Sequence, residues 1–142
     1  MDSGDLHTFD PGKHLVKDEA GTLTIRKLRE KAKSEEETIV QPVSSRILPY
    51  LEARLKSGEG YGAEYASVRS FTASLRKRVQ SAMERAGLPR TDLKSLRHTY
   101  CTYHAERGVP LDVLRRWLGH SRDSRTLDRY YIHRASTARF MD

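Results

Sequence analysis

The chain has 142 residues, a hydrophobic fraction of 37% and a charged fraction of 32%. This length is enough for one domain with a sizeable core and too short to suggest two independent ones. Apolar residues recur at regular spacings, which favours a globular fold with a heavily solvated surface over a disordered chain. We therefore expect residues 1–142 to form a single domain.

The net charge of +7 is unevenly distributed along the chain. Residues 1–65 contain 10 Lys and Arg against 12 Asp and Glu, whereas residues 66–142 contain 16 against 7. If the partner is a polyanion, the second half should face it. The charge alone fits either a DNA-binding protein or an RNA-binding, ribosome-associated one.

Cys101 is the single cysteine, which excludes an intramolecular disulfide and a Cys-based metal cluster. No apolar run approaches the ~20 residues needed to cross a bilayer. The first five residues have neither the basic start nor the apolar core of a signal peptide. We expect a cytoplasmic protein that does not bind membranes.

The first 43 residues predict a small sheet. Short β-branched runs at 14–16, 22–26 and 38–41 are separated by polar segments at 18–21 and 32–37. Runs of this length with such connections are typical of a three-stranded antiparallel sheet.

Residues 44–142 predict a helical region with a C-terminal tail, so the expected fold class is α+β, mainly α. A first helix starts at Ser44 or Ser45 and ends before a Gly-rich loop at 56–65. A long second helix over 68–86 has an apolar face formed by Val68, Phe71, Leu75, Val79, Ala82 and Ala86. Further helices are expected from a Thr91 cap to Gly108, from Pro110 to Gly119 and over about 124–131, followed by a tail at 134–142.

Three motifs follow one another in the second half. Residues 93–100 read LKSLRHTY, residues 118–120 read LGH, and residues 126–130 read TLDRY. In order and spacing they resemble the signature of the tyrosine recombinases, the phage integrase family, where an HxLRHT box precedes an LGH motif and then a tyrosine. The resemblance runs from about residue 14 onward and is strongest over 93–131.

This resemblance implies a reaction and a set of partners. A tyrosine attacks phosphorus in one DNA strand, giving a 3′-phosphotyrosyl link and a free 5′-hydroxyl, without a metal ion or other cofactor. The outcome would be site-specific recombination or integration of double-stranded DNA at the nucleoid. Other recombinase protomers on the same DNA would be partners, with the tail at 134–142 docking on a neighbour or on its own protomer.

The residue types agree with that chemistry. A phosphodiester under attack gathers negative charge on its non-bridging oxygens, which a planar guanidinium suits. Arg97 fits this role, and Lys94, on the same helix face, would share the phosphate. His120 follows a helix-ending glycine, where it can donate to a phosphate oxygen or cap the helix. The alternative for Arg97 is an ordinary solvated arginine.

For the nucleophilic tyrosine and the catalytic lysine, a second residue remains possible. Tyr130 is the predicted nucleophile because residues 126–130 match the family form without a gap, and the adjacent Tyr131 is the alternative. A phenol has a pKa near 10 and needs nearby cations or a base to react. Lys31 best matches the lysine of the family's hairpin and would protonate the leaving 5′-oxygen. Lys33 is the alternative, and either lysine can instead belong to a solvated charge run at 26–33.

Two features depart from the family's pattern. No TGLRxxE-type segment with its additional arginine precedes Asp10, so we expect a catalytic domain truncated at its N-terminus and slow or inactive alone. Lys94 stands where the family's box opens with histidine, which keeps a cation but removes a base. Three functions remain open: a recombinase catalytic domain, a recombinase-derived DNA-binding protein without activity, and an RNA-binding protein, which would need exposed aromatic side chains for stacking.

Overall fold

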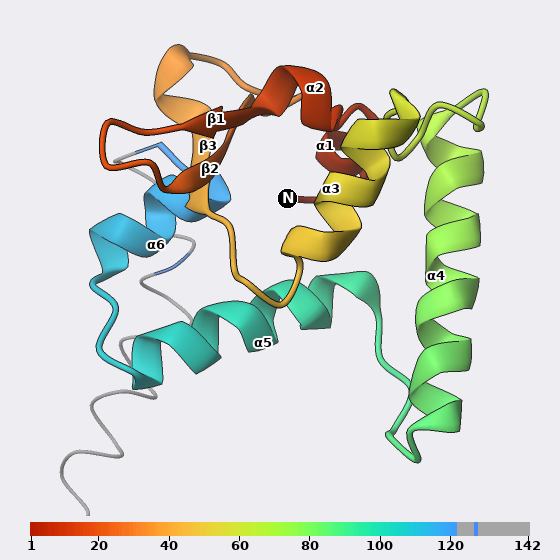
Figure 1. The fold of residues 1–142 in the computed structure, drawn as a ribbon. Coiled ribbons are helices and arrows are strands. Elements are labelled where there is room, and N and C mark those ends of the chain that lie inside the picture. The colour runs from red at the N-terminus through yellow and green to blue at the C-terminus, as the bar shows by residue number, and fades with distance from the viewer. Residues whose placement is uncertain (122–126, 128–142) are drawn as a thin grey trace, which may run out of the picture.

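Six α-helices and a small sheet make up the part of the chain that the structure, a computed structural model, describes: residues 1–121 and Leu127 (Figure 1). The helices are α1 (Ser3–His7), α2 (Pro11–His14), α3 (Leu48–Ser57), α4 (Val68–Arg85), α5 (Leu93–Glu106) and α6 (Leu111–Leu118). The strands are β1 (Leu15–Lys17), β2 (Leu23–Leu28) and β3 (Thr38–Pro42), and a 3-10 helix, η1, spans Glu35–Glu37. The predicted α+β, mainly α class is confirmed. Within the described residues, no helix is both long enough and apolar enough to cross a membrane.

The three strands pair antiparallel in the order β1-β2-β3, as predicted. Leu15 lies opposite Ile25, which on its other side lies opposite Gln41. The strand bounds differ from the predicted ones by one or two residues. The β1–β2 connection turns at Gly21, whose φ of +79° suits glycine.

Strand β2 sends alternate side chains to opposite faces of the sheet. Ile25 and Lys27 are buried, whereas Arg26 and Leu28 are exposed. Arg29, one residue beyond the strand, continues the buried series, and its side chain is only 16% exposed. A positively charged side chain is thus directed inward from the end of this strand.

Two hydrophobic clusters hold the described part together. The first lies between the sheet and the helices that precede and follow it, and its buried side chains are Phe9, Ile25, Ile39 and Leu51. The second joins α5 and α6 to a later residue through Cys101, Leu118 and Leu127. Because α6 also packs on β3, the sheet, α6 and α5 are connected in series.

Helices α1 and α2 were not predicted. They contain five and four residues, too few to show a helical period in the sequence. Asp2 and Asp5 form a reciprocal capping box at the start of α1, with N···O distances of 3.0 and 3.1 Å. Asp5 is only 1% exposed, so this short helix places a carboxylate in the interior.

Two predicted helix starts were wrong by a few residues. Helix α3 begins at Leu48 rather than near Ser44, because the Ser44 carbonyl closes a turn with the amides of Ile47 and Leu48 first. Asp92 rather than Thr91 caps α5: its carboxylate accepts from the Ser95 amide over 2.6 Å.

The remaining predictions about helices have mixed outcomes. Helices α4 and α6 lie where the sequence places them, and left-handed glycines follow at 87 and 119. The predicted apolar face of α4 is mostly open, with Phe71 its one buried residue. Apart from Leu127, the helix expected over 124–131 and the tail at 134–142 lie outside the described residues.

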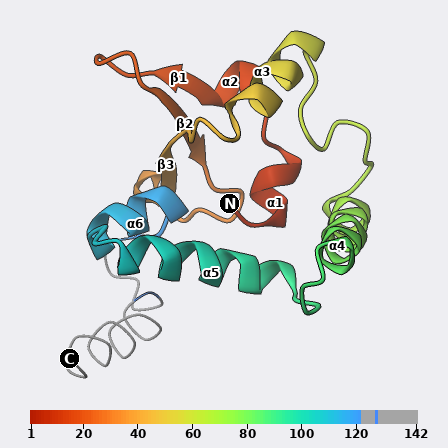
Figure 2. The ribbon, with the colours of Figure 1, turned by 60° about the horizontal axis from the view of Figure 1, so that its bottom comes forward.

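Helix α5 connects the two ends of the described part. Figures 1 and 2 show it running along one side, with α6 beside its C-terminal end and α4 beyond its N-terminal end. Residues from its N-terminal half therefore have α1 and α4 on one side and α6 on the other.

Candidate active site

Arg97 lies in the first half of α5 and reaches across to the end of α6. Its Nη2 atom donates to the carbonyl oxygen of Leu118 over 3.2 Å and lies 2.9 Å from Nε2 of His120. The structure therefore brings together two predicted site residues that are 23 positions apart in the sequence. Arg97 is half-buried, and its contact with a phosphate stays a prediction.

The turn after α6 directs His120 toward Arg97. Gly119 adopts φ +64° and ψ +43°, and the amide of His120 donates to the Arg115 carbonyl over 2.9 Å. A Cβ atom at position 119 would lie 2.8 Å from Cδ of Arg29, from the Glu37 carbonyl oxygen and from Cγ1 of Ile39. Glycine is needed here both for the left-handed backbone and for the close approach to the sheet.

His120 is a neutral imidazole with a defined tautomer. Arginine has only hydrogen-bond donors, so Nε2 of His120 must accept from Arg97 and the ring proton must be on Nδ1. Burial, followed by the positive charges of Arg97 and Arg29, lowers the pKa of His120 to about 4. At neutral pH the ring can therefore donate through Nδ1 but does not act as an imidazolium.

The positive charge of Arg97 has no paired carboxylate in the part of the chain that the structure describes. Its hydrogen-bond partners are a carbonyl oxygen and a neutral ring, and no ion pair involves it among the described residues. Burial, and then the charge of Arg29, lower the pKa of Arg97, although a guanidinium remains protonated. A partly buried cation without a counterion is suited to bind an anion.

Arg29 is a third cation of this region and was not predicted as a site residue from the sequence. Its Nη1 atom donates to the carbonyl oxygen of Gly119 over 3.3 Å. Unlike Arg97, it has carboxylates nearby: Asp2 at 3.3 Å, Asp5 at 3.6 Å and Glu37 at 3.8 Å. Its inward direction follows from the register of β2, in which every second residue from Ile25 faces inward.

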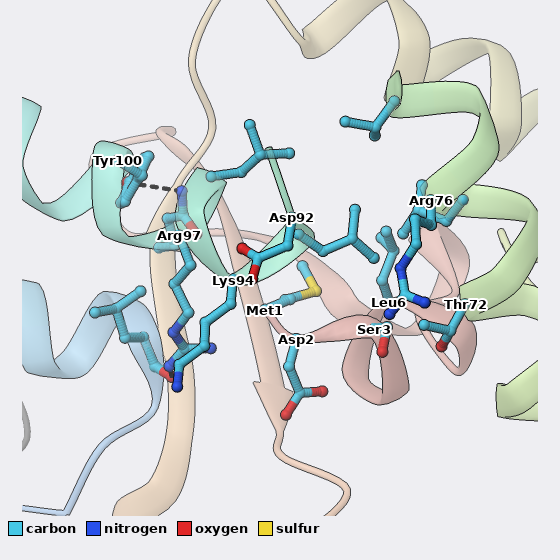
Figure 3. Close-up of a pocket in the computed structure, with 16 residues that line it drawn as sticks. Met1, Asp2, Ser3, Leu6, Thr72, Arg76, Asp92, Lys94, Arg97 and Tyr100 are labelled. Atoms are coloured by element: carbon cyan, nitrogen blue, oxygen red, sulfur yellow. Dashed lines mark hydrogen bonds between the residues drawn. The ribbon is translucent and has the colours of Figure 1, made fainter. Parts of the chain in front are cut away.

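Lys94 lies one turn before Arg97 on α5 and is exposed. Figure 3 shows the Lys94 and Arg97 side chains extending from the helix in the same direction. Both line a cavity of about 580 Å³ between α1, α4 and α5. Its apolar lining comes mainly from Leu6, Leu75, Val79, Leu93 and Leu96. The predicted pairing of the two cations on one face thus agrees with their placement.

The two candidate lysines of the hairpin lie apart from this group. Lys31 and Lys33 are exposed between β2 and η1 and do not line the cavity. Arg29, two residues before Lys31, is the hairpin residue that reaches the end of α6.

Tyr130 and Tyr131 lie outside the described residues. Leu127, three residues before Tyr130, is buried against Leu118, whose carbonyl accepts from Arg97. No three His, Cys, Asp or Glu side chains of the described residues gather as a metal site would require.

Comparison with known proteins agrees with this arrangement. The model of the phage integrase family matches residues 13–137. A tyrosine recombinase XerC-like protein from Caldanaerobacter subterraneus is 30% identical over 130 residues, which cover 80% of this chain and 33% of that protein. No solved structure matches the chain significantly.

The match of the family model over residues 13–137 covers the small antiparallel sheet and the helices that follow it. The chain belongs to the phage integrase family. It spans about a third of the length of the curated relative that it matches.

Proposed function

We propose that this chain takes part in site-specific DNA recombination and carries the nucleophile, Tyr130. The observation that supports this best is Arg97, a partly buried guanidinium without a carboxylate partner among the described residues, hydrogen-bonded to a neutral His120. A cation in this setting fits the non-bridging oxygens of a phosphodiester. Burial of Leu127 against Leu118 anchors the chain close to this pair, three residues before Tyr130.

In the proposed step, the phenol oxygen of Tyr130 attacks phosphorus, and the bond from phosphorus to the 5′-oxygen breaks. Arg97 stabilises the charge that develops on the non-bridging oxygens, with Lys94 as a second cation on the same helix face. His120 donates from Nδ1 to a phosphate oxygen. The phenol proton passes to solvent water, and Lys31, or Lys33 in its place, gives a proton to the departing 5′-oxygen.

Double-stranded DNA is the proposed substrate, with other protomers of a recombinase on the same DNA. The long helix α4 carries exposed cations around its surface, which suit a polyanion: Arg69, Arg76, Lys77, Arg78 and Arg85. Residues 66–142, which contain this helix and α5, hold all of the excess positive charge. Such a surface gives affinity for the DNA backbone without regard to sequence.

The second candidate is a DNA-binding protein that does not cleave. The observation in its favour is Lys94, which replaces a histidine of the family's box and cannot accept a proton at neutral pH. Binding would then survive and strand cleavage would not.

A covalent-trapping assay separates the two candidates. Duplexes that the chain retains from a random pool are rebuilt with a nick beside the cleaved phosphate, so that the released fragment diffuses away and religation stops. We expect a protein–DNA adduct that resists denaturant, and we expect Tyr130→Phe to abolish it while binding is retained. Binding without any adduct would favour the second candidate.

A further inference from the structure

Two arginines from different elements donate to consecutive carbonyls at the end of α6. Arg97, from α5, donates to the oxygen of Leu118 over 3.2 Å, and Arg29, from the end of β2, donates to the oxygen of Gly119 over 3.3 Å. The last carbonyls of a helix have no partner within it, and this end of the helix dipole favours cations. The turn that holds His120 is thus fixed from two sides.

The guanidinium of Arg29 is itself held in place. Its Nη2 atom lies 3.3 Å from Oδ2 of Asp2, and its Nε atom lies 3.6 Å from Oδ2 of Asp5. Asp5 is buried and also accepts from the amide of Glu30 over 2.8 Å. Arg29 therefore connects the capping box of α1 and the hairpin to the Gly119 carbonyl through one rigid planar group.

We propose that Arg29 is a positioning residue of the phosphate site: it fixes the Gly119 carbonyl so that His120 meets Arg97 in one orientation with its ring proton on Nδ1. This inference rests on the proposed function, because it concerns the same site. Arg29 acts through His120 and Arg97 rather than on the phosphate, since its own charge is already compensated by carboxylates.

A guanidinium is required for this role. Its separate N–H groups donate to the Gly119 carbonyl on one side and to Asp2 on the other, and Asp5 is an ion-pair partner at 3.6 Å. A single ammonium on a flexible chain has no planar fork with which to hold both directions at once. Lysine at position 29 would preserve the charge while the turn at Gly119 loses its fixed partner.

The test is the tautomer of His120 in the free chain, read from long-range ¹H–¹⁵N spectra of the full-length protein. Wild type should show the Nδ1–H form alone at neutral pH. Arg29→Lys and Arg29→Met should both give a mixture of tautomers at His120. Arg26→Met, at an exposed arginine of β2 three positions earlier, is the matched control and should match wild type.

A single Nδ1–H tautomer at His120 in folded Arg29→Lys overturns the proposal. A positive charge at position 29 would then be enough to fix the tautomer, without a guanidinium. Amide spectra report whether each variant is folded. If Arg29→Met unfolds, Arg29→Lys, which keeps a cation beside the carboxylates, decides the question. The spectra contain no DNA, so they are independent of whether the chain cleaves it.

The covalent-trapping assay supplies the second readout. We expect Arg29→Lys to slow adduct formation by on the order of 10- to 100-fold, as a misplaced site would, with little change in the Kd for DNA. An unchanged rate in this variant counts against a positioning role. If wild type forms no adduct, the proposed function fails, while the tautomer of His120 still decides the role of Arg29.

Discussion

Arg97 donates to His120 across 2.9 Å, from the middle of one helix to the turn after the next. This hydrogen bond uses Nε2 of the ring and leaves Nδ1 as the donor that faces other partners. It also leaves the guanidinium with neutral partners among the described residues, so its charge is available to an anion.

Removing Arg97 should affect chemistry more than binding. Arg97→Ala takes away the cation that stabilises charge on the non-bridging oxygens, so the rate of adduct formation on trapping substrates should fall on the order of 10²- to 10³-fold. The Kd for DNA should change much less, because the exposed cations of α4 remain. Equal losses of rate and of binding would mean that Arg97 contributes only general affinity.

The low pKa of His120 should make stability depend on pH. In the folded chain its pKa is about 4, against about 6.5 in the unfolded chain, so between these values only the unfolded state binds the proton. This contribution to the free energy of unfolding is therefore complete above pH 6.5 and is lost as pH falls toward 4. The slope is at most about 1.4 kcal/mol per pH unit, and solvent screening of the half-buried ring reduces it.

His120→Gln supplies the comparison for this pH effect. Burial also lowers the pKa of His14 and His104, so wild type has further contributions of the same sign. The difference between wild type and His120→Gln in urea unfolding, measured from pH 4 to 7.5, should isolate the slope of His120. Parallel curves for the two proteins would show that the ring is not protected from protonation by folding.

Gly119→Ala should destabilise the chain more than a comparable change elsewhere. The substitution forces alanine to φ +64° and places its Cβ atom 2.8 Å from each of three atoms of the hairpin, two in side chains and one in the backbone. We expect a loss of roughly 2–4 kcal/mol, combining backbone strain with the close contacts. Gly108→Ala is the matched control: its φ is +81° but nothing lies within 4 Å of the added Cβ, so about 1 kcal/mol is expected.

If Gly119→Ala destabilises the chain no more than Gly108→Ala does, the turn after α6 can move away from the sheet. The measurement is the midpoint of thermal unfolding for both variants beside wild type.

DNA binding should weaken steeply with salt, because phosphate contacts release counterions. Lys77→Gln, on the exposed face of α4, should reduce the slope of log K against log salt by about 0.9 if this lysine contacts one phosphate. Lys17→Gln, an exposed lysine on β1 in the acidic half, is the matched control and should leave the slope unchanged. Filter binding over a salt series measures the slope for each variant and for wild type. Equal slopes in the three proteins would mean that DNA does not contact Lys77 and binds another surface.

The sequence predicted Arg97 and His120 as separate phosphate contacts because each residue has a recognisable setting, a box on an amphipathic helix and a helix-ending glycine, but it did not predict the hydrogen bond between them. It did not predict Arg29, since nothing in a run of charges at 26–33 distinguishes a solvated arginine from one directed inward. That distinction depends on the register of β2, where Ile25 and Lys27 define the buried face. The short helix α1 was not predicted either. Its five residues include a capping pair but are too few to show the helical repeat of apolar residues.

The most direct test of the account is to identify the amino acid that becomes linked to DNA. The trapped adduct is digested with a protease and a nuclease, and the peptide that carries the residual nucleotide is sequenced by mass spectrometry. We predict a phosphotyrosyl bond at Tyr130, absent in Tyr130→Phe and retained in Tyr131→Phe. A nucleotide on Tyr131 would contradict the assignment of the nucleophile, and a chain that binds DNA but yields no linked peptide would contradict the proposed strand cleavage itself.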